Sequence, residues 1–168
     1  MLNAAIWLGA ALFYTLSVAP AMISLDMLAL FGKSSAFYSG SVEQILRTRY
    51  LYWHTVCALI ALLHLLIEWL YLGRVLPRLW SGLVMVLLAL GFLGCFWLRP
   101  KLAKLHRAQY YLNVRPDNRE AAAQSFRLWY DVFRALNVLM IGGVGVYFWR
   151  ATNPPDALRF VSPAKFRG

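Results

Sequence analysis

The chain has 168 residues, of which 61% are hydrophobic, 15% are aromatic and only 14% are charged. Soluble domains contain roughly 45–50% apolar residues, so this composition excludes an ordinary water-soluble domain. The formal net charge of +10 does not indicate nucleic-acid binding, because the Lys and Arg residues gather at the ends of apolar segments, as anionic headgroups and the positive-inside rule require.

Long apolar segments dominate the chain, and no charged residue occurs in 1–25, 50–67 or 79–98. About 20 apolar residues in a helix cross the ~30 Å hydrocarbon core of a bilayer. We predict an all-α polytopic membrane protein, a four-helix bundle over residues 1–150. Its helices are predicted at about 4–30, 46–72, 78–98 and 120–150. A basic tail, 151–168, follows.

Prolines and glycines suggest where these helices bend or end. Pro20 should kink the first helix, and Pro100 should end the third. Helix 2 should end at Gly73 and helix 3 should start after Pro77. This short connection predicts a tight antiparallel hairpin. The first residues, Met1 to Ala4, lack the basic region of a signal peptide, so we expect a membrane helix there.

Basic residues predict the orientation. Ten lie on the side of the first and third connections: Lys33, Arg47, Arg49, Arg99, Lys101, Lys104, Arg107, Arg115, Arg119 and Arg127. Six lie on the opposite side: Arg74, Arg78, Arg150, Arg159, Lys165 and Arg167. The positive-inside rule therefore favours connections 31–45 and 99–119 inside and both termini outside, in a bacterial inner membrane.

Helix 2 carries a polar stripe at 4-3-4-3-4 spacing: Tyr50, His54, Cys57, Ala61, His64 and Glu68. This stripe is less apolar than the leucine-rich remainder, so we expect it to face the interior of the bundle. His64 and Glu68 are i,i+4 neighbours and are predicted to form a second polar pair.

Helix 4 carries a polar stripe of its own: Arg127, Asp131, Arg134 and Asn137. Helices 2 and 4 enter from the same side, which predicts an intramembrane cluster near the inner face. Its members would be Asp26, His54, Asp131 and Arg134. Charged side chains inside a membrane cost free energy, so they usually have a structural or functional role. Two remain open here: a packing network that fixes the helices, or a path for an ion or proton.

Cofactor and metal sites find little support in the sequence. His54 and His64 lie ten residues, or roughly 15 Å, apart on one helix, so they cannot ligate one haem iron. Either would need a second copy or a partner subunit to bind haem, and a single His would suffice for a pigment. His106 is expected in a connection outside the membrane. His54 and Cys57 offer only two soft metal ligands. We predict no cofactor beyond bound lipid, no metal and no catalytic motif.

The first helix contains the segment Ala5 to Phe13, with Trp7, Gly9 and Phe13, followed by Val18-Ala19-Pro20. It resembles a bacterial four-helix membrane family of unknown function, similar to the transmembrane protein 205 group, which opens with Trp-x-Gly-x-x-x-Phe and a Val-x-Pro turn. Phe126 to Tyr130 and Asn137 match its last helix. Tyr130 stands where the family has a histidine. The resemblance implies the fold and no established reaction.

Three functions follow as hypotheses. The first is a non-catalytic accessory subunit of a larger membrane complex, for example an energy-transducing one, with partner contacts through the tail and the 101–119 connection. The second is a small transporter or metal-resistance protein that uses the intramembrane His/Asp/Arg cluster. The third is a membrane anchor for haem, quinone or pigment.

Overall fold

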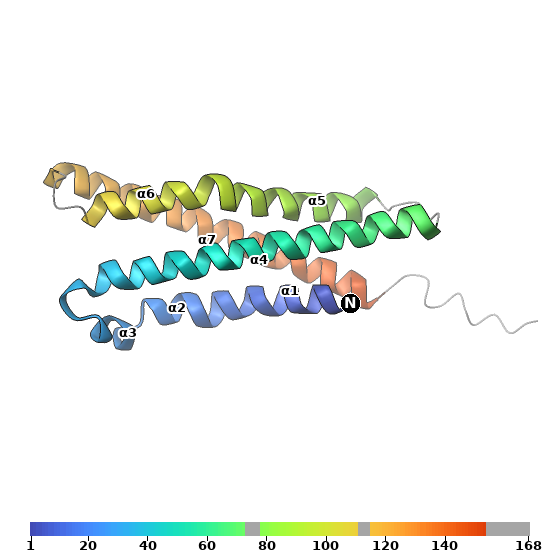
Figure 1. Cartoon of the computed structure of the whole chain (residues 1–168), viewed down its shortest axis with the longest axis horizontal. Helices are drawn as coiled ribbons and strands as arrows, with labels where there is room; N and C mark the ends of the chain where they lie inside the picture. The colour runs from blue at the N-terminus through green and yellow to red at the C-terminus, as the bar shows by residue number, and fades with distance from the viewer. Residues whose placement is uncertain (73–77, 111–114, 154–168) are drawn as a thin grey trace, which may run out of the picture.

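The computed structural model describes residues 1–72, 78–110 and 115–153, and throughout these ranges the chain forms helices and no strand. Four long helical segments run alternately up and down and form a bundle (Figure 1). The first consists of α1 (Leu2–Phe13), η1 (Tyr14–Val18) and α2 (Ala19–Met22), the second is α4 (Ser35–Leu72), the third consists of α5 (Arg78–Leu93), η3 (Gly94–Leu98) and α6 (Arg99–Tyr110), and the fourth is α7 (Pro116–Thr152).

Each of the four segments is long and apolar enough to cross a membrane: Leu2–Met22, Ser35–Tyr71, Arg78–Tyr110 and Pro116–Thr152. This confirms the predicted all-α architecture with four transmembrane helices. The predicted hairpin turn at 73–77 and the tail beyond Asn153 lie outside the described residues, although α4 and α5 do pack against one another.

Pro20 and Pro100 lie in the interior of described helical segments, and each is accommodated by a widened turn. A π-helical turn, η1, ends two residues before Pro20, and a second one, η3, ends two residues before Pro100. Proline lacks the backbone donor and its ring clashes with the carbonyl four residues earlier, and a π turn at that place relieves both problems. The prediction that Pro100 ends helix 3 is therefore wrong, because the helix continues to Tyr110 as α6.

The first helix ends earlier than predicted, at Met22 rather than near residue 30. A separate short helix, α3 (Leu25–Leu30), follows, and the Ser24 Oγ accepts a hydrogen bond from the Met27 N–H at 3.3 Å as its N-cap. A 3₁₀ turn, η2 (Gly32–Ser34), then leads into α4, with Gly32 at φ +59°, which favours glycine.

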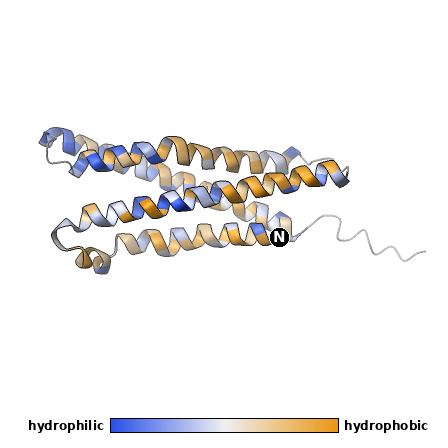
Figure 2. Cartoon of the chain, viewed as in Figure 1, coloured by the Kyte–Doolittle hydropathy of each residue, from blue (hydrophilic) through white to orange (hydrophobic). Residues whose placement is uncertain are grey.

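Residues predicted as connections are largely helical. α4 has 38 residues and α7 has 37, so each extends for roughly 55 Å, well beyond the ~30 Å hydrocarbon core. Their extra turns gather at one end, together with α3 and the last turns of α6, and this end is the more hydrophilic one (Figure 2). We call it the polar end.

The first segment and the α5–α6 segment each pack against both α4 and α7. α4 and α7 therefore occupy opposite corners of the bundle, and polar side chains from both reach its centre. Close packing of α5 on α4 depends on Gly91, where an added Cβ would lie 2.8 Å from the Thr55 Oγ1 and 3.1 Å from the His54 Cδ2.

Candidate functional site

A row of buried and half-buried polar side chains runs along the inner face of α4, and we call it the polar seam. Its members on α4 are Glu43, Arg47, Tyr50 and His54; those on other helices are Trp7, Tyr14, Thr15 and Asn137. Buried polar groups are stable only when hydrogen-bonded, so the partners of each one define what the seam can do.

The seam begins near the polar end with a buried ion pair. The Arg47 Nη1 lies 3.3 Å from the Glu43 Oε2, and the two side chains are only 3% and 6% exposed. The Tyr14 hydroxyl donates to the other carboxylate oxygen at 3.1 Å. The Arg47 guanidinium also lies over the rings of Tyr130 and Phe133, 5.6 and 5.2 Å from their centroids. Three helical segments thus converge on one pair of charges whose sum is zero.

The middle of the seam joins α4, α7 and the first segment. The Tyr50 hydroxyl donates to the Asn137 Oδ1 at 2.7 Å, and the Asn137 Nδ2 donates to the Thr15 Oγ1, also at 2.7 Å. Tyr14 stacks on Tyr50 with ring centroids 4.4 Å apart. This chain of bonds ties the diagonal helices together across the core.

His54 is the last residue of the seam along α4, at the end farthest from the polar end, and it is 0% exposed. The Trp7 indole N–H donates to its Nδ1 at 2.9 Å, and its Nε2 lies 3.1 Å from the Leu87 carbonyl oxygen. A carbonyl only accepts, so this arrangement assigns the proton to Nε2 and leaves the ring neutral. Both nitrogens are engaged, so neither has a free lone pair for a metal or haem iron.

Beside the polar seam lies an open cleft of about 590 Å³ between the first segment and α7. Its apolar walls include Pro20, Met22, Phe126 and Val138, and Tyr14, Glu43 and Asn137 of the seam contribute to its surface. His106 and Ser39 line it toward the polar end. Arg127 and Arg134 also line it. The size of the cleft and its mainly apolar surface with polar groups at defined positions are typical of small-molecule sites.

The family described as "Domain of unknown function (DUF4149)" matches residues 2–110, more than half of the chain. The chain belongs to the DUF4149 family. This confirms the expected membership in a family of unknown function. The matched range contributes Trp7, Glu43 and His54 of the polar seam, whereas α7, which supplies Asn137 and one wall of the cleft, lies beyond it. No curated protein and no solved structure matches the chain.

In this DUF4149 protein the structure does not assemble the predicted cluster. His54 is fully buried, whereas Asp26 is exposed on α3 and the side chains of Asp131 and Arg134 are 72% and 68% exposed. Asp131 and Arg134 do approach one another, at 4.0 Å. The reason is the rotation of α7, which turns Phe133, Asn137 and Met140 inward and the two charges outward.

The predicted stripe on α4 faces the interior for only part of its length. Tyr50, His54, Cys57 and Ala61 are buried, but His64 and Glu68 are 63% and 40% exposed, with His64 Nε2 and Glu68 Oε1 3.4 Å apart. The start of the first segment reaches α4 at the level of Cys57, whose carbonyl oxygen accepts a bond from the Asn3 side chain. The stripe is therefore covered near that level and becomes exposed further along α4.

Several residues of the site carry no clear signal in the sequence. Glu43 and Arg47 lie in a stretch predicted as connection or helix start, although their i,i+4 spacing is the signal of a helical ion pair. Tyr14 and Trp7 fall within the apolar first helix, where nothing distinguishes them from packing residues. His106, predicted in a connection outside the membrane, is 4% exposed within α6, with its Nε2 3.5 Å from the Ser41 Oγ.

Asn137 is a member of the predicted stripe on the fourth helix, and the structure gives it a central place in the polar seam. Its bond to the Tyr50 hydroxyl joins residues 87 positions apart. No spacing within either helix relates these two residues, so only the packed bundle reveals the pair.

Proposed function

We propose that this protein is a non-catalytic integral membrane protein that holds an amphipathic molecule in the cleft between the first segment and α7. The observation that carries the proposal is the cleft itself, about 590 Å³ in volume, with a mainly apolar surface and polar side chains that include Tyr14, Glu43 and Asn137. An isoprenoid quinone or a lipid has this combination of a long apolar body and a polar head.

The partners of the polar seam support a binding role over a catalytic one. Glu43 is neutralised by Arg47 and bonded to Tyr14, and His54 uses both nitrogens. General bases need a free lone pair within reach of a substrate. Haem ligation by His54 would require the loss of at least one of its bonds. The transport hypothesis relies on a cluster of Asp26, His54, Asp131 and Arg134, and these residues do not form a common site. If the protein transports a substrate, the cleft is therefore the site that would hold it.

The test is to fill the cleft and measure what the purified protein retains. Ala123 lines the cleft on α7, and Ala121, two residues earlier, is exposed and does not line it. Ala123→Trp should reduce the co-purifying amphiphile, identified by mass spectrometry after solvent extraction, by tenfold or more, a loss of ~1.4 kcal/mol of binding. Ala121→Trp should retain it. Equal retention by both variants, or no stoichiometric ligand in the unmodified protein, would refute the proposal.

A second candidate, the accessory subunit, is favoured by the exposed pair of His64 and Glu68. Polar groups on a membrane helix usually face protein rather than lipid, and this pair continues a stripe that the described chain buries only up to Ala61. We propose that a partner subunit covers it and also contacts the tail, 151–168, most of which lies outside the described residues.

This candidate is tested by co-purification in mild detergent. A His64→Leu/Glu68→Leu variant and a chain truncated after Arg150 should each lose the partner proteins that the unmodified chain retains. The matched control is Asp131→Leu/Arg134→Leu, which removes the other exposed pair. If the partners stay with all of these variants, the chain is not held in a complex through these surfaces.

We further propose a bacterial inner membrane location with both termini outside, and kinship of this family with the transmembrane protein 205 group. The supporting features are the basic polar end and the Trp7, Gly9, Phe13 and Pro20 positions of the first segment. Within that segment Trp7 has a defined task, since it supports His54.

A further inference from the structure

A second groove lies between α4 and α6 and has a volume of about 630 Å³. Four arginines and one histidine line it: Arg47, Arg49, Arg99, Arg107 and His106. None of the described residues that line this groove is acidic. We call it the basic groove, and unlike the cleft, which Glu43 lines, it has no acidic residue in its described lining.

The charge of the basic groove is only partly compensated. Arg47 is paired with Glu43, and the Arg99 Nη1 donates to the neutral Tyr52 hydroxyl at 2.8 Å. Within the described ranges Arg49, Arg99 and Arg107 have no acidic partner within ion-pair distance. Three uncompensated cations along one groove would attract an anion.

A buried donor points to the same chemistry. The Nε2 of Gln44, which lines the basic groove, is buried and has no hydrogen-bond partner among the residues that the structure describes. Buried donors normally have acceptors, and each unsatisfied one costs free energy. A phosphate oxygen in the groove would satisfy it.

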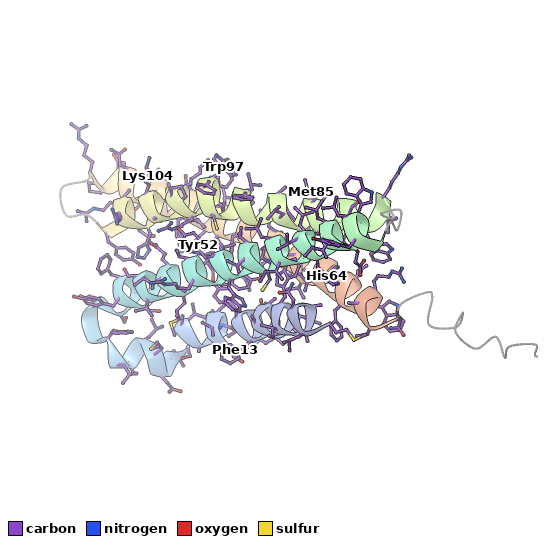
Figure 3. The ribbon with its side chains drawn as sticks, turned by 45° about the vertical axis from the view of Figure 1, so that its right-hand side comes forward. Phe13, Tyr52, His64, Met85, Trp97 and Lys104 are labelled. Carbon is purple, nitrogen blue, oxygen red and sulfur yellow. The ribbon has the colours of Figure 1, made fainter. Side chains whose placement is uncertain are left out.

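The depth of the basic groove identifies the source of the anion. The groove extends along α4 from Phe37 to Tyr52, and the uncharged apolar stretch of α4 begins at Tyr50. In Figure 3, Tyr52 and Lys104 lie toward the polar end and His64 toward the opposite end. Headgroups lie where apolar helix gives way to polar helix, and tyrosines are enriched at that level.

A third, apolar groove lies further along the same face of α4. It has a volume of about 370 Å³ and is lined by leucines including Leu59, Leu63 and Leu66. These follow Tyr52 at helical spacings of seven, eleven and fourteen residues, which keeps them on one face of α4. The distance from Tyr52 to Leu66 is roughly 21 Å along the axis, which matches the reach of an acyl chain below its headgroup.

We propose that the basic groove binds the phosphate of an anionic phospholipid, with an acyl chain lying in the apolar groove. Basic pockets between transmembrane helices recognise such headgroups through charge and hydrogen bonds. Arg49 and Arg107 neutralise the phosphate, Gln44 donates to it, and the leucine groove distinguishes a lipid from a soluble phosphate.

Native mass spectrometry of the full chain in detergent tests this with three probes: dioleoyl phosphatidylglycerol, dioleoyl phosphatidylcholine and inorganic phosphate. The unmodified protein should bind phosphatidylglycerol more tightly than phosphatidylcholine. Arg49→Gln/Arg107→Gln should weaken phosphatidylglycerol binding about 10- to 30-fold. The charge-matched control is Arg78→Gln/Lys104→Gln, two exposed cations that do not line the groove, and it should bind as the unmodified protein does.

Two further measurements distinguish a seated lipid from a soluble anion and from lipid adhering at random to the helices. Leu63→Trp should weaken phosphatidylglycerol binding by filling the apolar groove, whereas Leu139→Trp, exposed on α7, should not. Inorganic phosphate at millimolar concentration should leave lipid binding unchanged. Equal weakening in the groove and control variants, absence of a preference for phosphatidylglycerol, or displacement by phosphate would each overturn the proposal.

Discussion

Two acid–arginine pairs show how surroundings decide the role of a residue. Glu43 and Arg47 are buried where three helical segments meet, while Asp131 and Arg134 project outward from α7. Both pairs have helical spacing, but only the first is enclosed by the bundle. Water or headgroups screen an exposed pair, whereas a buried charge depends on its partner.

For these pairs we predict that Glu43→Gln destabilises the protein by about 3–5 kcal/mol, because it leaves the Arg47 guanidinium buried without a counter-charge. Asp131→Asn should change the free energy of unfolding by no more than about 0.5 kcal/mol. Unfolding by sodium dodecyl sulfate in mixed micelles measures both. The double variant Glu43→Leu/Arg47→Met should recover most of the loss, since it removes both charges together. Equal effects of the two single variants would contradict the buried geometry.

Individual helices of the bundle contain residues that local preference would disfavour. Pro20 and Pro100 lie inside helical segments, each preceded by a π turn. Gly91 and Gly94 would weaken a free helix, but they allow the third segment to approach α4 so closely that a Cβ at either would lie within 2.9 Å of a side-chain atom of α4. Packing therefore outweighs local preference.

Two glycines provide a matched test of that packing. At Gly91 an added Cβ would meet Thr55, whose Oγ1 is fixed by a bond to the Leu51 carbonyl at 2.9 Å, while at Gly142 an added Cβ would meet nothing within 4 Å. Gly91→Ala should cost about 1–3 kcal/mol through overpacking. Gly142→Ala should be neutral or stabilising by up to about 1 kcal/mol, because alanine favours helix. Unfolding in mixed micelles measures the free energy of unfolding of both variants. If Gly91→Ala is more stable than the unmodified protein, α5 does not approach α4 as closely as the structure shows.

The whole molecule is an apolar four-helix bundle with a hydrophilic extension at one end (Figure 2). The sequence of that extension is rich in Lys and Arg. The polar seam, the cleft and the basic groove all lie near the transition between these parts. Since helices 37 and 38 residues long exceed the hydrocarbon core, the extension has to stand outside it. The positive-inside rule then predicts which side it occupies.

Accessibility of introduced cysteines in intact cells tests this orientation. Lys104→Cys, on α6 at the polar end, should react with a membrane-impermeant maleimide only after the cells are opened. Arg78→Cys, at the first residue of α5, should react in intact cells. The unmodified chain is the background control, because Cys57 and Cys95 are both buried. The reverse pattern would place both termini inside.

Hydrophobic length and charge-free stretches were enough to predict four membrane helices, because the bilayer selects for them regardless of how they pack. Helical periodicity also correctly predicted that Tyr50, His54, Cys57 and Ala61 face the interior of the bundle. Periodicity fails at His64 and Glu68, since a stripe is buried only where another helix covers it. The prediction from periodicity also fails at Asp131 and Arg134, because the packing of neighbouring helices decides how α7 is rotated.

An all-α membrane protein with four spans and a basic end follows from the order of the amino acids alone, since composition and segment length carry that information locally. Which polar residues meet is a property of the packed bundle. Trp7 and His54, Tyr14 and Glu43, and Tyr50 and Asn137 are separated by 29 to 87 positions, and no local pattern relates them. Which of these residues meet depends on the level and the rotation at which the helices pack. Close contacts between helices, such as the contact of α5 with α4 at Gly91, determine that level and rotation.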